Sequence, residues 1–265
     1  MNSPRGDRAV VLVHGWPGLG SDYDEVQDRL GEVEVFVPDL LGFGPAFDGE
    51  VALEEATAES HARRLLRSLD DRGMSSDIVI AGYDIGSRIA QAALRLDPSR
   101  FIGAVLTPAY PGIGERAADP RLASVFWYQH FHREIIAQEL IDGKPEAMGA
   151  YLDYLWSTWS GPTALSVHPH REEIIAAYSR PGAFAASVQW YRANRGYAGC
   201  HGRIDTSVTI LWPSHDPLFP PEWADRLNEF FTNVTLMPVE GSGHFVPLEA
   251  ATDVASAIRA HLALP

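Results

Sequence analysis

A glycine-flanked aspartate is the residue of this chain best placed for covalent chemistry. Asp84 lies in Gly82-Tyr83-Asp84-Ile85-Gly86, after an apolar run and before a helical pattern. This is the spacing of a strand–turn–helix bend, in which the glycines allow close backbone approach and the central side chain is exposed. The positive end of the helix dipole would keep its carboxylate ionised and nucleophilic. Aspartate is also a common helix cap, so a purely structural role is the alternative.

A histidine and a second aspartate follow later apolar runs and suit general-base chemistry. His244 comes after Gly241-Ser242-Gly243 on the loop behind the last run, and Asp216 follows the preceding run. A carboxylate can orient an imidazole and stabilise its protonated form, while the imidazole activates water. We therefore expect nucleophile, acid and base in the chain order 84, 216, 244. The alternatives are a structural histidine and an ordinary turn aspartate before a proline.

A third motif could stabilise a developing oxyanion. The segment His14-Gly15-Trp16-Pro17 directly follows the first apolar run. We expect the backbone N–H groups of Trp16 and Ile85 to form an oxyanion hole, because such a site needs preorganised donors and no side chain. Taken alone, a turn rich in glycine and proline is equally compatible with a structural role.

These residues require a frame of alternating strands and helices. Most of the β-branched runs are apolar at successive positions, as in parallel strands buried on both faces. The alternation predicts an α/β fold with a mostly parallel central sheet of about six strands and helices on both faces. Strands are expected at 10–13, 33–37, 78–80, 102–106, 208–211 and 234–237, and helices at 50–72, 87–97, 221–231 and 249–262.

The alternation stops between about 115 and 200, where Trp, Tyr, Phe and His are frequent and the periodicity is helical. We expect a helical lid (cap) inserted at 115–200, over the carboxyl ends of the strands, where ligands of such sheets bind. The core domain would then consist of 1–114 and 201–265.

Composition narrows the class of partner. The 265 residues include 21 basic and 35 acidic ones, and the net charge of −14 disfavours nucleic acid and anionic membranes. No stretch resembles a membrane span, and the polar start lacks a signal-peptide core, so the expected location is the cytoplasm. Lys144 is the only lysine, which indicates a GC-rich bacterial genome.

Neither a metal nor a cofactor is expected. The single cysteine, Cys200, can form no internal disulfide and fits no thiol-enzyme pattern. The histidines of the aromatic stretch show no spacing typical of metal ligands; they are His130, His132, His168, His170 and His201.

Together these motifs resemble the epoxide hydrolase and haloalkane dehalogenase branch of the α/β-hydrolase superfamily. The resemblance covers nearly the whole chain and rests on the segments 14–17 and 38–44, the aspartate turn, Asp216 and Gly243-His244-Phe245. It implies an α/β-hydrolase fold with a lid and an Asp84–Asp216–His244 triad. Asp84 would attack a saturated carbon to form an alkyl-enzyme ester, which water activated by His244 would hydrolyse.

The resemblance also implies how an epoxide is opened. Lid tyrosines of this branch supply the proton for the epoxide oxygen, and the segments 126–129 and 189–192 match those that carry them, which gives Tyr128 and Tyr191. The alternative is that these aromatics only pack the lid. The expected partner is a small, largely apolar epoxide, and the side chains expected to contact it are those of His14, Phe126, Trp127 and Trp190.

Several positions depart from the family pattern. Many haloalkane dehalogenases carry Trp directly after the nucleophile, where this chain has Ile85. Arg88 matches one of the two arginines with which fluoroacetate dehalogenases hold the substrate carboxylate, although the expected role here is a structural salt bridge. Tyr83 stands where the branch often has His. A haloalkane or haloacid dehalogenase is the alternative enzyme, and a ligand-binding receptor without turnover is the alternative class.

The two leading strands of the family look missing or vestigial, because the first run begins by Val10. The run at 33–37 would then lie at the sheet edge, where Glu32 and Glu34 would discourage edge pairing. Docking of that edge to a second subunit is compatible with the sequence, so a homo-oligomer stays open.

Overall fold

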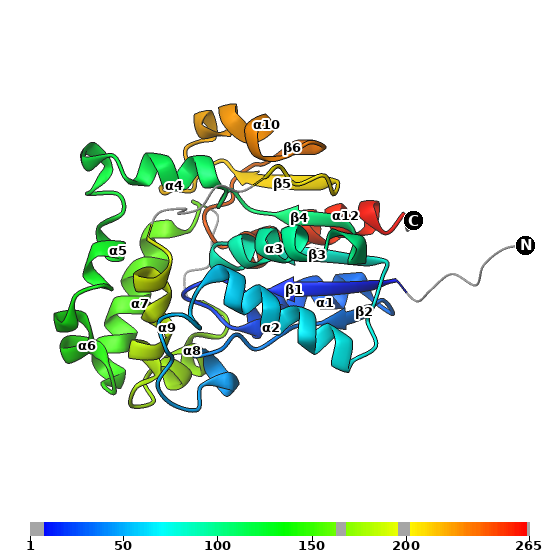
Figure 1. The fold of residues 1–265 in the computed structure, drawn as a ribbon. Helices are drawn as coiled ribbons and strands as arrows, with labels where there is room; N and C mark the ends of the chain where they lie inside the picture. Colours follow the sequence, from blue (N-terminus) through cyan, green and yellow to red (C-terminus); the bar gives the residue numbers. More distant parts are fainter. Residues whose placement is uncertain (1–7, 163–167, 196–201, 264–265) are drawn as a thin grey trace, which may run out of the picture.

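One open sheet of parallel strands runs through the molecule (Figure 1). The computed structural model describes residues 8–162, 168–195 and 202–263. Within these ranges the sheet has six strands in the order β2-β1-β3-β4-β5-β6. All six predicted strands are confirmed, each end within two residues, as β1 (Ala9–Val13), β2 (Glu34–Phe36), β3 (Ile78–Gly82), β4 (Phe101–Leu106), β5 (Val208–Pro213) and β6 (Val234–Val239).

The parallel register brings the motif-bearing loops to one edge of the sheet. Val13 pairs with Gly82, and Gly82 pairs with Leu106, so the loops that follow β1, β3 and β4 begin side by side. The central strands β1 and β3 are buried along their whole length, which explains their unbroken apolar runs. Strand β2 lies at the sheet edge as expected, and its Glu34 is exposed.

Helices cover both faces of the sheet. Helices α2 and α3 pack together on the near face in Figure 1, and α1 and α12 pack together behind it. The side chain of Thr57 accepts a hydrogen bond from the N–H of Ser60, so α2 starts there rather than at residue 50 as predicted. These helices are α1 (Asp24–Leu30), α2 (Ala58–Asp71), α3 (Ile85–Leu96) and α12 (Ala251–His261), and short 3-10 helices span Gly20–Tyr23, Gly44–Ala46 and Pro98–Arg100.

Two of the predicted helices are shorter or divided. The stretch 221–231 forms a 3-10 helix (Pro221–Arg226) followed by the four-residue α10 (Leu227–Phe230). The stretch 249–262 begins at the last residue of the short α11 (Val246–Glu249), and α12 begins only at Ala251. The 3-10 helix and α11 each have proline in the first turn. Proline suits this position because the N–H that it lacks would have no partner within the helix there.

Helices gather at the carboxyl ends of the strands, at the left of Figure 1. The described part of 115–200 contains helices and no strand, and the predicted boundary at 115 falls inside α4. Side chains of this stretch, among them Tyr128, Trp159 and Tyr191, belong to the same apolar core as the strands. The helices are α4 (Pro111–Ala117), a 3-10 helix (Pro120–Leu122), α5 (Trp127–Phe131), α6 (Ile135–Ile141), α7 (Pro145–Trp159), α8 (Arg171–Tyr178) and α9 (Ala183–Ala193).

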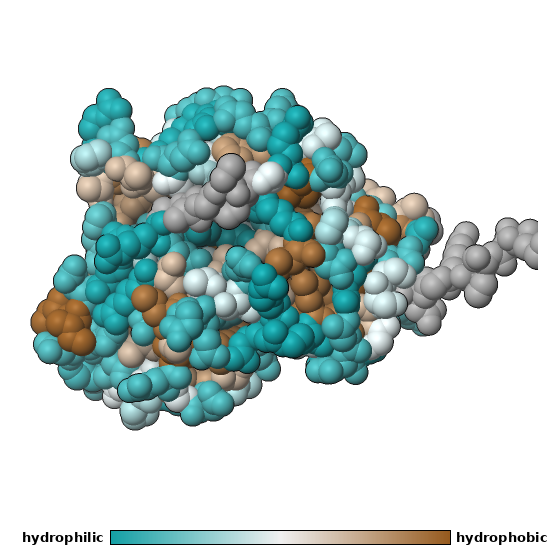
Figure 2. Space-filling view, viewed as in Figure 1, coloured by the Kyte–Doolittle hydropathy of each residue, from teal (hydrophilic) through white to brown (hydrophobic). Residues whose placement is uncertain are grey.

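The outer face of this helical end is partly apolar. Ile135, Ile136 and Leu140 on α6 are exposed, and an apolar patch lies over α6 at the left edge of Figure 2. The rest of the face in Figure 2 is mainly hydrophilic. No helix among the described residues combines the length and apolar character needed to cross a bilayer.

Candidate active site

Asp84 occupies the apex of a tight bend between β3 and α3. Its backbone has φ 49° and ψ −122°, a left-handed conformation that a residue other than glycine adopts only under constraint. A Cβ atom on Gly82 would lie 2.5 Å from the carbonyl oxygen of Gly86, and one on Gly86 would lie 2.1 Å from that of Val13. Both glycines are therefore required, because strand and helix approach each other too closely for any side chain.

The loop after β1 holds one carboxylate oxygen of Asp84. The backbone N–H of Trp16 donates to Asp84 Oδ2 over 2.9 Å, and its role as an oxyanion-hole donor stays a prediction. The indole of Trp16 is fully buried and its Nε1–H donates to Ser187 Oγ over 3.2 Å, which fixes the direction of the loop. Ile85 lines the cavity beside Asp84, but its N–H makes no bond to that carboxylate within the described residues, so its role stays a prediction.

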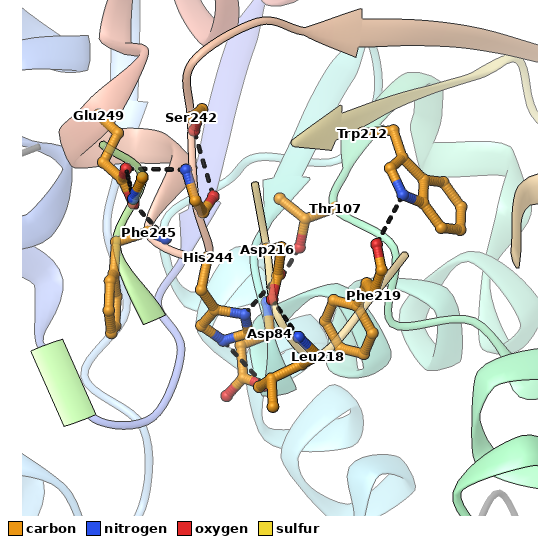
Figure 3. A network of polar contacts seen from close by, with 12 residues as sticks. Asp84, Thr107, Trp212, Asp216, Leu218, Phe219, Ser242, His244, Phe245 and Glu249 are labelled. Carbon is orange, nitrogen blue, oxygen red and sulfur yellow. Dashed lines mark hydrogen bonds and ion pairs between the residues drawn. The ribbon is translucent and has the colours of Figure 1, made fainter. Parts of the chain in front are cut away.

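The structure brings the three residues of the expected triad together (Figure 3). His244 Nδ1 lies 2.8 Å from Asp216 Oδ2, and the N–H of Leu218 donates to Asp216 Oδ1 over 2.8 Å. His244 Nε2 faces Asp84 Oδ1 at 3.7 Å, an ion-pair distance rather than a hydrogen bond. All three side chains are nearly buried, so water screens their charges poorly.

Electrostatics favour a protonated imidazole in this state of the protein. Burial alone would lower the pKa of His244, but the carboxylates of Asp216 and Asp84 outweigh it and raise the pKa to about 10. At neutral pH the imidazolium therefore lies between two carboxylates. The affinity of the imidazole for its proton depends on the charge of Asp84. A covalent adduct on a carboxylate oxygen of Asp84 would remove that charge.

A small cavity opens at the Asp84 carboxylate, with about 60 Å³ accessible to water-sized molecules. Tyr128 and Tyr191 both line it, and their ring centroids are 5.7 Å apart. Burial, and then the charge of Asp84, raise the pKa values of both phenols well above the usual range, so both stay protonated at neutral pH. Three other predicted site residues lie on the cavity wall, namely Ile85, Phe126 and Trp190. The polar side chains on the wall are those of Arg88, Gln129, Arg133 and Asn194.

Two residues expected to contact substrate lie elsewhere. Trp127 is 36% exposed and packs on the rings of Tyr151 and Tyr154, because α5 presents it to the outer side of the helical layer. His14 is buried, with Nδ1 3.0 Å from the carbonyl oxygen of Gly15 and its ring against Phe43. Burial lowers the pKa of His14 to about 4, which keeps it neutral. Neither is among the residues that line the cavity, so their contact with substrate stays a prediction.

Tyr83, which precedes Asp84 in the bend, places its side chain in the interior and pairs it with a buried carboxylate. Its hydroxyl donates to Asp22 Oδ2 in the interior, and burial raises the pKa of Asp22 to about 7. His168 Nε2 approaches Asp22 Oδ1 from the helical layer at 3.5 Å. Arg88 lines the cavity, with its guanidinium carbon 5.3 Å from the Trp190 ring centroid, and the predicted salt bridge stays a prediction.

Sequence reasoning missed residues that support the triad through the backbone. Thr107 Oγ1 accepts the N–H of Asp84 over 3.1 Å, and the carbonyl oxygen of Trp159 accepts the N–H of His244 over 2.8 Å. Thr107 directly follows β4, a position that could have been noticed. Nothing local in the sequence connects Trp159 with the histidine loop.

The described ranges contain no cluster of three or more His, Cys, Asp or Glu side chains placed to bind a metal ion. Tyr151 Oη lies 2.7 Å from His132 Nε2, inside an aromatic cluster, and His130 Nδ1 contacts Arg133. Cys200 and His201 lie outside the described residues.

Comparison with known proteins gives the same fold. An epoxide hydrolase from Bacillus megaterium, solved with an inhibitor, has a TM-score of 0.78 at 15% identity, covering 97% of this chain and 93% of that one. The epoxide hydrolase CorEH, solved without ligand, has a TM-score of 0.81 at 21% identity, covering 97% and 91%. At such identities the likeness shows the fold alone.

Sequence comparison extends the likeness to proteins with other activities. Lipase 3 from Moraxella sp. (strain TA144) is 29% identical over 83 residues, which are 31% of this chain. The match spans only 26% of the length of that curated relative. A family model described as the alpha/beta hydrolase family matches residues 10–257. Since that match covers most of the sequence, this chain is a member of the alpha/beta hydrolase family.

Proposed function

We propose that this hydrolase opens an epoxide to a vicinal diol through a covalent ester on Asp84. One observation carries the proposal: a buried carboxylate at the apex of the bend and two protonated tyrosines line the same small cavity. A carboxylate attacking an ester would give a reactive anhydride, so it suits displacement at saturated carbon instead. An epoxide oxygen needs a proton as the ring opens, and a phenol can supply one.

In the first step, Asp84 Oδ1 forms a bond to an epoxide carbon while the ring C–O bond breaks. Oδ2 is the oxygen already bonded to the N–H of Trp16, which leaves Oδ1 as the attacking atom. The ring oxygen leaves as an alkoxide and takes its proton from Tyr191 or Tyr128. The products of this step are an alkyl ester and a tyrosinate. The imidazolium of His244, which no longer faces a charged Asp84, then gives its proton to the tyrosinate through solvent and becomes neutral.

In the second step, His244 takes a proton from water, and the resulting hydroxide attacks Cγ of the Asp84 ester. The charge that develops on Oδ2 is stabilised by the N–H of Trp16. The ester C–O bond then breaks, the diol departs and Asp84 is regenerated. The departing alkoxide takes the proton of the hydroxyl added to Cγ, so Asp84 is again a carboxylate and His244 again an imidazolium, and the sum is epoxide plus water to diol.

The same charges explain why His244 can serve as a base. In the free enzyme, two carboxylates keep its pKa near 10. Esterification neutralises Asp84 and removes one of them, so the pKa falls when neutral imidazole is needed.

The helical stretch 115–200 would act as a lid in this mechanism. Its residues Tyr128 and Tyr191 line the cavity together with Asp84. The polar wall, with Arg88 and Arg133, indicates a substrate that also carries a polar or anionic group. Homo-oligomerisation stays a prediction.

Dehalogenation of a small haloacid is the second candidate. The two arginines on the cavity wall favour it, since guanidinium groups bind carboxylates well. A halide leaving group usually needs an indole donor, and the indole N–H of Trp16 is already bonded to Ser187.

A substrate panel separates the two activities. The purified protein is incubated with styrene oxide, glycidate, 1-chlorobutane and chloroacetate, and both diol and free halide are measured. The proposal expects diol from an epoxide and no halide. Halide release from chloroacetate without diol would favour the second candidate, and neither product would favour a binding protein.

A further inference from the structure

Glu249, the last residue of α11, binds three backbone N–H groups from two separate parts of the chain (Figure 3). Its Oε2 accepts from Gly243 and from Gly161, each over 2.8 Å, and its Oε1 accepts from Phe245 over 3.0 Å. Gly243 and Phe245 are the two neighbours of His244. A carboxylate that accepts several N–H groups makes stronger hydrogen bonds than a neutral acceptor.

The two segments joined by Glu249 are also in direct backbone contact. The N–H of His244 donates to the carbonyl oxygen of Trp159 over 2.8 Å. A Cβ atom on Gly161 would lie 2.3 Å from the carbonyl oxygen of Gly241, and one on Gly243 would lie 2.3 Å from the nitrogen of Gly161. The contact is therefore too close to admit a side chain at either glycine.

The backbone around His244 is fixed at three consecutive N–H groups. Those of Gly243 and Phe245 bond to the Glu249 carboxylate, and that of His244 bonds to Trp159. Within the described ranges, the imidazole itself is hydrogen-bonded to Asp216, and its Nε2 faces Asp84 at 3.7 Å. The direction in which Nε2 points therefore depends on how firmly this backbone is held.

We propose that Glu249 is a positioning residue for His244, which clamps the histidine loop to the end of α7. This inference rests on the proposed function, in which Asp84 forms the ester and His244 hydrolyses it. Loss of the clamp would let the imidazole shift relative to the ester carbon, and a misplacement of about 1 Å can cost on the order of 100-fold in rate. Formation of the ester does not use His244 as a base, so the two steps should respond differently.

Glu249→Gln tests the clamp without changing the size of the side chain. An amide has one oxygen for three N–H donors, so its NH2 group must face a donor. With styrene oxide in single-turnover, rapid-quench experiments, intact-protein mass spectrometry gives the rates of ester formation and hydrolysis separately. We expect hydrolysis to slow by roughly 10- to 100-fold, with formation changed by less than about twofold. The control is Glu240→Gln, the same change at an exposed residue of the same loop.

Gly161→Ala is an independent variant that should reproduce the effect, because its methyl group would wedge the two segments apart. Gly202→Ala is its control, since a Cβ there would meet nothing within 4 Å. Equal slowing of both steps in Glu249→Gln, or a lowered melting temperature with both rates unchanged, would overturn the proposal.

A readout independent of turnover separates this inference from the proposed function. If wild-type protein forms neither ester nor diol, the proposed function fails, and amide hydrogen exchange then decides the role of Glu249. We expect faster exchange at Gly161, Gly243 and Phe245 in Glu249→Gln but not in Glu240→Gln. Unchanged exchange at these amides would refute the clamp.

Discussion

Replacement of Asp216 by Asn should stop the second chemical step while sparing the first. In the wild type, Asp216 Oδ2 meets His244 Nδ1 at 2.8 Å, and Oδ1 accepts the N–H of Leu218 at 2.8 Å. An asparagine has one oxygen for these two donors. If the oxygen faces Leu218, the NH2 group faces Nδ1 and enforces the tautomer that carries its proton on Nε2, which cannot accept a proton from water.

The structure sets the size of the effect. The lost charge-assisted hydrogen bond to a buried imidazolium is worth about 1.5 to 3 kcal/mol, and a buried donor left unsatisfied costs about 1 to 3 kcal/mol. The sum, about 2.5 to 6 kcal/mol, corresponds to a slowing of roughly 10² to 10⁴. Ester formation should change much less, because Asp84 and the tyrosines remain in place.

Rapid-quench kinetics with an epoxide measure both steps, and Asp225→Asn, at an exposed residue, is the matched control. We expect the alkyl-enzyme to accumulate in Asp216→Asn and not in the control. Hydrolysis within about threefold of the wild-type rate would refute the role given to Asp216.

Two further predictions concern Tyr191, the proposed proton donor, and His61, a buried histidine. Tyr191→Phe should slow ester formation about 100-fold in the same single-turnover assay, whereas the exposed Tyr154→Phe should not, and equal rates would remove Tyr191 from the mechanism. Burial, and then the neighbouring His14 and Arg64, lower the pKa of His61 from 6.5 to about 3. The unfolded chain therefore binds a proton that the folded protein does not, and His61 lowers the free energy of unfolding as pH falls below 6.5, by about 1.4 kcal/mol per pH unit. His61→Gln should flatten this dependence in urea unfolding at pH 7, 6 and 5, and parallel profiles would contradict it.

The sheet was predictable because parallel buried strands have a strong local signal. Unbroken apolar runs such as that of β3 identify a strand, and the strand order then brings the loops after β1 and β3 together. The bend at Asp84 also has a strong local signal, because its geometry requires a glycine two residues before and two residues after the aspartate. The start of α2 was less so, because the cap at Thr57 outweighs the helical pattern before it.

Side-chain direction in the helical layer could not be read from the sequence. Trp127 and Tyr128 are neighbours on α5, yet Tyr128 lines the cavity and Trp127 packs on the outer side. Helical periodicity alone does not say which face meets the sheet when both faces carry aromatics. The bond of Glu249 to Gly161 was invisible for another reason: it joins segments far apart in the chain through a backbone N–H group, which leaves no mark in residue type.

The most direct test of a covalent ester on Asp84 is intact-protein and peptide mass spectrometry of His244→Gln after exposure to epoxides. Without its base, the ester should persist, and the mass of the peptide that contains Asp84 should rise by that of one epoxide molecule. Asp84→Ala, treated in the same way, should show no increase. Diol formation at the wild-type rate by Asp84→Ala, or an adduct on a different peptide, would contradict the account.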